Sequence, residues 1–312
     1  MKKIDLELLL EECLSEGKKV IKDGNVADYI PELKNVNKEN IGIHLYTLDN
    51  EEYSASNEEF TFSMQSVVKI VLFALALMDN ELDRVLSKVG VKPSADPFNS
   101  IVKLEETEDH KPLNPFINAG AIASTSLIAA DDYQGKFDRV IALLEKLFDR
   151  ESIEIDEKVF ISESTTGDTN RALAYFMKSR GILDKEEDVE ELLSIYFKSC
   201  SILASTRDLS KLGAVLANKG KAPWSGEQII PERINQIVCA VMTTCGLYDY
   251  SGEFAVIVGM PAKSGVGGGI VCVSHNNMGI GVSSPALDSH GNSIAGIEML
   301  RVLSNKLDIS IF

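Results

Sequence analysis

The sequence predicts an α/β fold in which an all-helical segment is inserted into a part that contains a β-sheet. Alternating strand-like patterns occur near the N-terminus, at residues 41–48 and 52–56, and again after residue 248. Between about residues 80 and 240, apolar residues instead recur at helical spacing. We therefore expect a single domain over residues 1–312, in which residues 1–70 and 240–312 form the α/β part and residues 71–239 form the helical part.

The N-terminal elements begin with a helix. Residues 4–22 carry apolar side chains at helical spacing, and Asp23-Gly24 ends the pattern. Residues 41–48 alternate as a strand does, and Asp49-Asn50 is a plausible hairpin turn into residues 52–56. Residues 66–79 are apolar almost throughout, which predicts a buried helix.

The remaining elements follow the same two periods. Helical patterns cover residues 119–130, 137–148, 171–178 and 209–218, and a polar loop over residues 162–171 is expected to enter the third of these helices. Residues 254–260, 269–274 and 278–283 are interpreted as strands, with turns at Asn276-Asn277 and around Lys263. An amphipathic helix over about residues 293–307 comes last.

Charge and hydropathy exclude two classes of partner. The 312 residues include 31 Lys and Arg against 47 Asp and Glu, a net charge of −16. A nucleic-acid-binding protein needs a basic surplus to neutralise phosphates, and an anionic membrane surface would repel this chain. The longest apolar run, residues 70–78, is far shorter than the roughly 20 residues that cross a bilayer. We therefore expect no nucleic-acid partner and no membrane association.

The cysteines and the N-terminus indicate the compartment. Met1-Lys2-Lys3 is followed at once by acidic residues, and no apolar segment of an export signal comes after them. The five cysteines are odd in number and form no CxxC pair. Free thiols are typical of a reducing compartment, so the expected location is the cytoplasm.

A candidate nucleophile and base occur together at Ser66-Val67-Val68-Lys69. Residues three apart share one face of a helix, so the hydroxyl and the amine can meet. A buried amine loses its proton more readily, and such an amine beside a hydroxyl activates a serine without histidine. The alternative is that Lys69 reaches solvent at the helix end or pairs with a distant carboxylate.

Glycines follow a second lysine-containing segment, Lys263-Ser264-Gly265. The next residues, 266–269, contain three more glycines, and glycines beside a strand let a substrate lie against backbone N–H groups that can act as oxyanion donors. The spacing fits neither GxGxxG nor a P-loop. The alternative is a tight turn followed by a bulged strand.

The other candidates each have a structural alternative. Asn118 stands where a helix is expected to begin and could be its N-cap. Within residues 162–171, Asp168 or Thr166 could cap the next helix and Glu163 could be solvated, and Tyr248 could simply pack at a rim. The four histidines lie far apart without a Cys/His cluster, so we expect no metal. No GxSxG elbow marks a serine for a Ser–His–Asp triad, although such a triad is not excluded.

Together these segments carry a family resemblance. Ser66-x-x-Lys69 followed nearly 200 residues later by Lys263-Ser264-Gly265 resembles the penicillin-recognising serine enzymes. From about residue 20 to residue 293, further segments look like those of the serine-dependent glutaminase family. They are Ala27-Asp28-Tyr29-Ile30-Pro31, Gln65-Ser66, Asn114-Pro115-Phe116-Ile117-Asn118-Ala119-Gly120-Ala121-Ile122, Ser162-Glu163 with Gly167-Asp168-Thr169-Asn170, Tyr196-Phe197 with Cys200-Ser201, Gly246-Leu247-Tyr248-Asp249, Pro261-Ala262-Lys263-Ser264-Gly265-Val266, Leu287-Asp288 and Gly291-Asn292-Ser293.

The resemblance implies a β-lactamase/transpeptidase-like fold, an antiparallel sheet flanked by N- and C-terminal helices plus a helical subdomain. It implies hydrolysis of L-glutamine to L-glutamate and ammonia, with no cofactor and no metal, by a homo-oligomer (a dimer or tetramer). Ser66 would be the nucleophile, Lys69 its base, Tyr248 and Tyr29 members of the proton relay, and the N–H groups of Ser66 and Val266 the oxyanion hole. The substrate-binding residues would be Gln65, Ser66, Asn118, Glu163, Asn170, Tyr196, Tyr248 and Val266.

Two alternative functions remain at this point. One is a β-lactam hydrolase or transpeptidase of the same fold, although such enzymes act outside the cytoplasm and the sequence has no Ser-Asp-Asn segment. The other is a non-catalytic ligand sensor, although the nucleophile, the lysine and the Lys-Ser-Gly segment are all present.

Overall fold

The computed structural model describes residues 5–28, 30–94, 100, 102–106 and 109–312. Tyr29 therefore lies outside the described residues. The strands are β1 Gly42–Thr47, β2 Glu52–Ser56, β3 Phe62–Ser63, β4 Leu203–Ala204, β5 Ala262–Ser264, β6 Gly269–Ser274 and β7 Met278–Ser283. The helices are α1 Leu6–Val20, α2 Lys69–Asp79, α3 Leu82–Lys88, α4 Val102–Glu106, α5 Asn118–Ser126, α6 Tyr133–Phe148, α7 Glu157–Thr166, α8 Asp168–Ser179, α9 Val189–Cys200, α10 Thr206–Ala217, α11 Glu232–Cys245, α12 Ser251–Ile257 and α13 Ile294–Leu307. Four short 3-10 turns are η1 Ile21–Asp23, η2 Pro31–Asn35, η3 Gln65–Val68 and η4 Tyr248–Tyr250.

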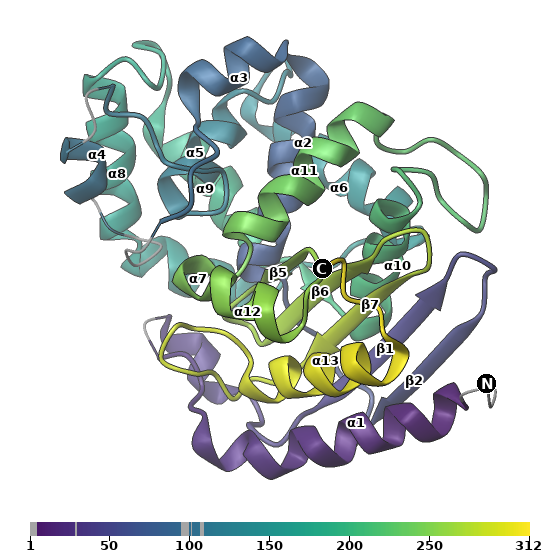
Figure 1. Cartoon of the computed structure of the whole chain (residues 1–312). Coiled ribbons are helices and arrows are strands. Elements are labelled where there is room, and N and C mark those ends of the chain that lie inside the picture. The colour runs from purple at the N-terminus through teal and green to yellow at the C-terminus, as the bar shows by residue number, and fades with distance from the viewer. Residues whose placement is uncertain (1–4, 29, 95–99, 101, 107–108) are drawn as a thin grey trace.

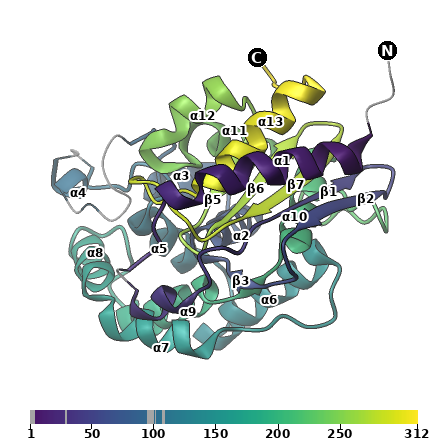
Figure 2. The same cartoon turned by 90° about the horizontal axis from the view of Figure 1, so that it is seen from below.

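A five-stranded antiparallel sheet joins the two ends of the chain. Its strand order is β2-β1-β7-β6-β5, so β1 from the N-terminal part pairs with β7 from the C-terminal part. Helices α1 and α13 pack against each other on one side of this sheet, while α10 lies against the other side (Figures 1 and 2). The separate β3–β4 pair carries the chain into the turn η3.

Strand β7 explains why α10 can lie so close to the sheet. Successive side chains of a strand point to opposite faces, and Ile280 and Val282 pack with α1 and α13 in one apolar cluster. Gly281 takes the opposite face, where an added Cβ would come within 2.0 Å of the Thr206 carbonyl oxygen on α10. The Gly-Ile-Gly-Val sequence therefore supplies one apolar face and one face that a helix backbone can contact.

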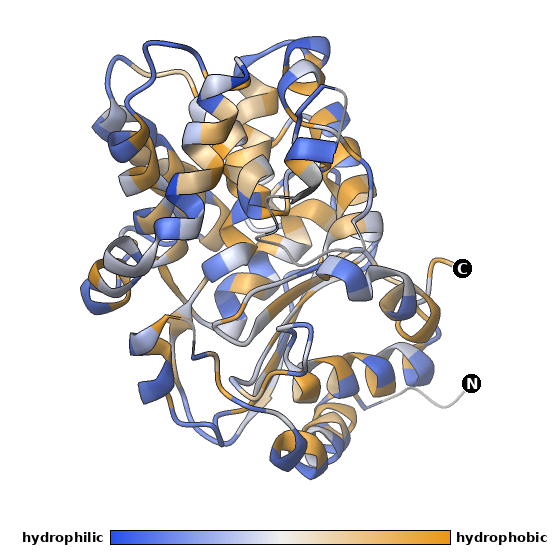
Figure 3. Cartoon of the chain, turned by 90° about the vertical axis from the view of Figure 1, so that its left-hand side faces the viewer, coloured by the Kyte–Doolittle hydropathy of each residue, from blue (hydrophilic) through white to orange (hydrophobic). Residues whose placement is uncertain are grey.

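The remaining helices surround a second and larger apolar cluster, whose centre is α2. Residues 69–77 of α2 are all buried. Helices α5, α6 and α11 pack against α2, and α9 packs against α5 and α6. In Figure 3, where the ribbon is coloured by hydropathy, many hydrophobic residues (orange) lie in the helices above the sheet. The predicted division into residues 1–70 with 240–312 and residues 71–239 stays a prediction; α10, which falls in the second segment, lies directly on the sheet.

Three local predictions were wrong. Residues 254–260 do not form a strand: residues 251–257 are helix α12, in which Phe254 is buried while Val256 is exposed. A short apolar run does not distinguish the two periods.

Residues 162–171 are not a loop but lie in α7 and α8, with Gly167 alone between them. There Ser164, Thr165 and Thr166 donate their hydroxyls to carbonyls four residues back, which satisfies them within a helix. Lys263 lies within β5 instead of in a turn.

Two further observations concern the expectations about compartment. All five cysteines are free, and four of them are buried. In the part of the chain that the structure describes, no helix has the length and apolar content needed to span a bilayer.

Candidate active site

Ser66 lies in the turn η3, immediately before α2. Its side chain is 8% exposed. The preceding residue, Gln65, has a φ of +48°, a left-handed conformation that non-glycine residues rarely adopt and that is common at functional sites. Residues 65–68 form a 3-10 turn, and α2 begins only at Lys69. The prediction that the α-helix begins at residue 66 was therefore wrong by three residues.

Lys69 begins α2 and is fully buried. Its Nζ donates to the Asn118 Oδ1 atom at 2.7 Å and to the Phe116 carbonyl oxygen at 3.2 Å. Both acceptors are neutral, and burial lowers the pKa of Lys69 to about 8. The sequence left open that the Lys69 amine reaches solvent or pairs with a distant carboxylate. Its full burial excludes the first, and these two hydrogen bonds go to an amide oxygen and a backbone carbonyl.

Asn118 is the centre of a polar chain across the helices. It is the first residue of α5, but Ile117 occupies the N-cap position, so Asn118 is not the cap. Its Nδ2 donates to Asn170 Oδ1 on α8 at 2.9 Å, and the Tyr196 hydroxyl of α9 donates to its Oδ1 at 3.3 Å. The structure thus brings together the side chains of Lys69, Asn118, Asn170 and Tyr196.

Glu163 supplies a buried carboxylate to the same region. It is 7% exposed, and burial raises its pKa to about 8 although Lys69 and a hydrogen bond with Gln65 act in the opposite direction. Its Oε2 atom is buried and has no hydrogen-bond partner among the described residues. An unpaired carboxylate oxygen in such a place is costly unless a ligand satisfies it.

These side chains line one small cavity of about 180 Å³. Six predicted substrate-binding residues lie in its wall, namely Gln65, Ser66, Asn118, Glu163, Asn170 and Tyr196. Ile30, Thr166, Gly167, Thr169 and Cys200 complete the lining. None of these five was among the predicted site residues, although Cys200 stands four residues after Tyr196 on α9 and therefore on the same helix face.

Tyr248 is not in the wall of this cavity but contacts Ser66, which is. Its phenol is a hydrogen-bond partner of Ser66, and its hydroxyl donates to the Ser264 carbonyl oxygen at 3.4 Å. Burial raises its pKa to about 12, so the phenol carries its proton over the ordinary pH range. The Lys263 Nζ lies 4.3 Å from the centre of the Tyr248 ring and donates to the same Ser264 carbonyl at 2.6 Å.

Val266 belongs to the loop between β5 and β6, and this loop touches the backbone beside the serine. An added Cβ on Gly265 would lie 2.5 Å from the Met64 carbonyl oxygen and 3.3 Å from the Ser66 nitrogen. Glycine at this position therefore permits the Val266 backbone to run next to that of Ser66, as an oxyanion hole requires.

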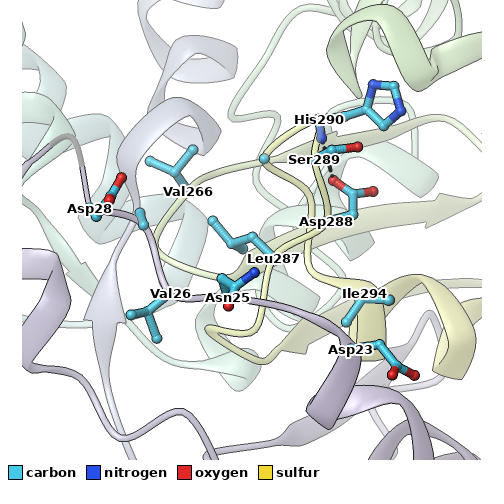
Figure 4. Close-up of a pocket in the computed structure, with 12 residues that line it drawn as sticks. Asp23, Asn25, Val26, Asp28, Val266, Leu287, Asp288, Ser289, His290 and Ile294 are labelled. Carbon is cyan, nitrogen blue, oxygen red and sulfur yellow. Dashed lines mark hydrogen bonds between the residues drawn. The ribbon is translucent and has the colours of Figure 1, made fainter.

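A larger cavity of about 600 Å³ lies on the other side of Val266. Figure 4 shows its wall, formed by residues 23–28 and by the segment from Leu287 to Ile294. Its lining includes three acidic residues, Asp23, Asp28 and Asp288, together with His290, whose backbone N–H donates a hydrogen bond to Asp288. Neither Ser66 nor Lys69 lines it.

Among the described residues no cluster of three His, Cys, Asp or Glu side chains could hold a metal.

An antiparallel sheet with a buried serine and lysine at the start of an adjacent helix defines the β-lactamase/transpeptidase-like class of proteins. The comparisons with known proteins narrow the class. A family profile described as Glutaminase matches residues 24–312. A Glutaminase of Clostridium botulinum strain Loch Maree is 50% identical over 304 residues, which cover 97% of this chain and 99% of that protein.

Solved structures agree with this family. A probable glutaminase of Bacillus subtilis superposes with a TM-score of 0.92 at 35% identity, over 98% of each chain. A covalent complex of a Bacillus subtilis glutaminase with 5-oxo-L-norleucine, formed from 6-diazo-5-oxo-L-norleucine, gives 0.89 at 34% identity, over 99% of this chain and 100% of that one. The chain belongs to the glutaminase family, and it is an enzyme with the β-lactamase-like fold of that family.

Proposed function

We propose that this enzyme hydrolyses the side-chain amide of L-glutamine through a γ-glutamyl ester of Ser66. The observation that carries the proposal is the small cavity in which Ser66 and the unpartnered Oε2 of Glu163 occur together. A glutamine molecule has an ammonium group for such a carboxylate and, three carbons further on, an amide carbon for a nucleophile. The covalent complex reported for the Bacillus subtilis relative is consistent with this chemistry.

Lys69 acts as the base in this mechanism. With its pKa lowered to about 8, a large fraction of the amine is neutral at slightly alkaline pH and can take the proton of Ser66. Its two hydrogen bonds to Asn118 and Phe116 fix the direction of the amine without supplying a counter-charge. Burial therefore shifts the amine toward its neutral form.

The tetrahedral intermediate requires donors for its oxyanion. We assign this role to the backbone N–H groups of Ser66 and Val266, because Gly265 permits their close approach. The departing nitrogen needs a proton, and Tyr248, protonated and bonded to Ser66, can pass one from Lys69 or give its own. Ammonia leaves, and Lys69 then activates a water that cleaves the ester to yield L-glutamate and free Ser66.

Recognition of the amino-acid end rests on the remaining polar residues. Glu163 would bind the α-ammonium, and a cation beside it would favour its ionised form in spite of burial. Gln65, Asn118, Asn170 and Tyr196 offer amide and phenol donors for the α-carboxylate. Tyr29, outside the described residues, keeps its proposed place in the proton relay on the family resemblance alone.

Two properties of the whole protein are also part of the proposal. A cytoplasmic location is supported by five free cysteines, because oxidising compartments favour disulfides. A homo-oligomer, dimer or tetramer, is proposed from the family resemblance. L-Glutamine is the proposed small-molecule partner.

Ammonia release by the purified protein tests the proposal. Wild-type protein with L-glutamine should release ammonia, and Ser66→Ala should abolish the release. Undiminished release by Ser66→Ala would overturn the mechanism, and no release by the wild type would favour a sensor. Turnover of a chromogenic cephalosporin without glutamine hydrolysis would favour a β-lactam-directed enzyme instead.

A further inference from the structure

Tyr248 has a backbone conformation that needs support. Its φ is +57°, in the left-handed region, where a tyrosine pays a steric penalty that glycine does not. Residues held in this way at functional sites persist because the surrounding structure fixes them. The phenol reaches Ser66 from this conformation, so whatever holds the backbone also sets the position of the hydroxyl.

The Ser251 side chain bridges two backbone groups, the N–H of Leu247 and the carbonyl of Tyr248 itself. Its Oγ accepts a hydrogen bond from the Leu247 N–H at 3.0 Å and donates to the Tyr248 carbonyl oxygen at 2.8 Å. Ser251 is 5% exposed, so water does not readily replace either bond. One hydroxyl therefore ties together the chain just before and just after the left-handed residue.

The surrounding contacts fix the tyrosine ring, and the Ser251 N–H also donates to the Tyr248 carbonyl oxygen, but the Leu247 N–H is held by the Ser251 hydroxyl. Gly246 accepts a bond from the Ser264 N–H at 3.2 Å, which attaches the start of the turn to β5. Lys263 contacts one face of the Tyr248 ring, and Ser264 accepts from its hydroxyl. All of these lie on the β5 side, whereas Ser251 acts on the backbone from α12.

We propose that Ser251 is a positioning residue for the reaction, because its hydroxyl holds Tyr248 in the left-handed conformation from which the phenol meets Ser66. This inference rests on the proposed function and deepens it. Ser251 does not line the substrate cavity, so it acts on the reaction through Tyr248 and not through glutamine. Its loss should therefore lower kcat and leave KM nearly unchanged.

The test compares Ser251→Ala with a matched control on α13. The Ser304 hydroxyl is likewise buried and donates to the Val258 carbonyl oxygen at 2.6 Å, a bond between α13 and the end of α12 instead of the Tyr248 backbone. We expect Ser251→Ala to lower kcat about tenfold or more with KM within about threefold. Ser304→Ala should lower Tm by a similar amount and leave kcat unchanged. Equal losses of kcat in both variants, or no loss in Ser251→Ala, would overturn the proposal.

A double-mutant cycle with Tyr248→Phe separates positioning from general destabilisation. If Ser251 acts through the phenol, Ser251→Ala should cause little further loss of kcat once that hydroxyl is gone, whereas additive losses would contradict the role. If Ser251→Ala does not fold, Ser251→Cys, which keeps the shape, takes its place in the cycle.

The outcomes also separate this inference from the mechanism on which it rests. Wild-type turnover with full activity in Tyr248→Phe would remove the role of Tyr248, and the positioning role with it. A large loss in Tyr248→Phe with none in Ser251→Ala would overturn the positioning role alone.

Discussion

Lys69 and Lys211 are both almost completely buried, yet their surroundings differ in the feature that decides their charge. On α10, the Lys211 Nζ lies 2.8 Å from the Asp149 Oδ2 atom and against the faces of Tyr46 and Trp224. On α2, the Lys69 Nζ has an amide oxygen and a backbone carbonyl as partners. In the described part of the chain, no ion pair joins Lys69 to a carboxylate.

The difference shows how one residue type serves two purposes in one molecule. A carboxylate and two aromatic faces surround the Lys211 amine, so Lys211 fastens α10 to the end of α6 through an ion pair. Burial lowers the pKa of Lys69 to about 8, so its amine can lose a proton and use the lone pair. Burial alone does not identify a catalytic lysine; for Lys69 the informative observations are its neutral hydrogen-bond partners and its position three residues after Ser66.

The largest expected loss of activity comes from removing the amine of Lys69, with removal of the Lys211 amine as the comparison. Lys69→Met should lower kcat by about a thousandfold or more, because the base is lost while the packing volume is kept. Lys211→Met should lower Tm and leave kcat near the wild-type value. Steady-state kinetics and thermal unfolding of both variants check the comparison, and comparable kcat values in the two would contradict it.

The pH dependence of activity follows from the direction of the Lys69 shift. The amine must be neutral to act as a base, so activity should be lost as pH falls below about 8. For one such group, kcat/KM at pH 6 should be roughly fifty- to a hundredfold below its value at pH 8.5. Glu163, with its pKa raised to about 8, acts in the same direction, and Tyr248, raised to about 12, stays protonated. A profile that is flat from pH 6 to 9 would count against Lys69 as the base.

A smaller loss of activity is expected when Glu163, a carboxylate in the same region as Lys69, is replaced. Glu163→Gln keeps the shape of the side chain but removes the charge proposed for the α-ammonium of glutamine. A hydrogen bond to a charged group contributes about 2 kcal/mol, which corresponds to a rise in KM of about thirtyfold. Kinetics with L-glutamine measure this rise. A change confined to kcat would instead place Glu163 in the chemical steps.

The smallest effect is expected at the partner of Lys211. Asp149 is about half exposed, with a side-chain exposure of 51%, and has a φ of +53° that asparagine tolerates. Asp149→Asn should therefore cost at most about 1 kcal/mol of stability and leave kcat unaltered. Denaturant unfolding measures the cost, and a loss of activity would show that the two lysine regions are coupled.

Much of this contrast was accessible from the sequence, and some of it was not. The nine apolar residues 70–78 that follow Lys69 predicted its burial, and the spacing to Ser66 predicted their common site. The acceptors of Lys69 were not predictable from local patterns, because Phe116 and Asn118 are 47 and 49 residues away and come together only through the packing of α5 on α2.

The fold shows the same limit. The period of two found β1, β2, β6 and β7, and the helical period found α1, α2, α6 and α13. The helical period did not identify residues 254–260, because α12 is short and apolar on more than one side. The left-handed conformation of Tyr248 and the bridging role of Ser251 depend on three-dimensional contacts and left no signal in composition or spacing.

The most direct test of the central claim, that Ser66 attacks the substrate carbonyl carbon, is to find which atom becomes covalently modified. The protein would be treated with 6-diazo-5-oxo-L-norleucine, the compound that gave the covalent complex of the Bacillus subtilis relative, and then digested for peptide mass mapping. The account predicts a single 5-oxo-L-norleucine adduct on Ser66 and none in Ser66→Ala. An adduct on Lys69, Cys200 or any other residue of the wild type, with Ser66 unmodified, would contradict it.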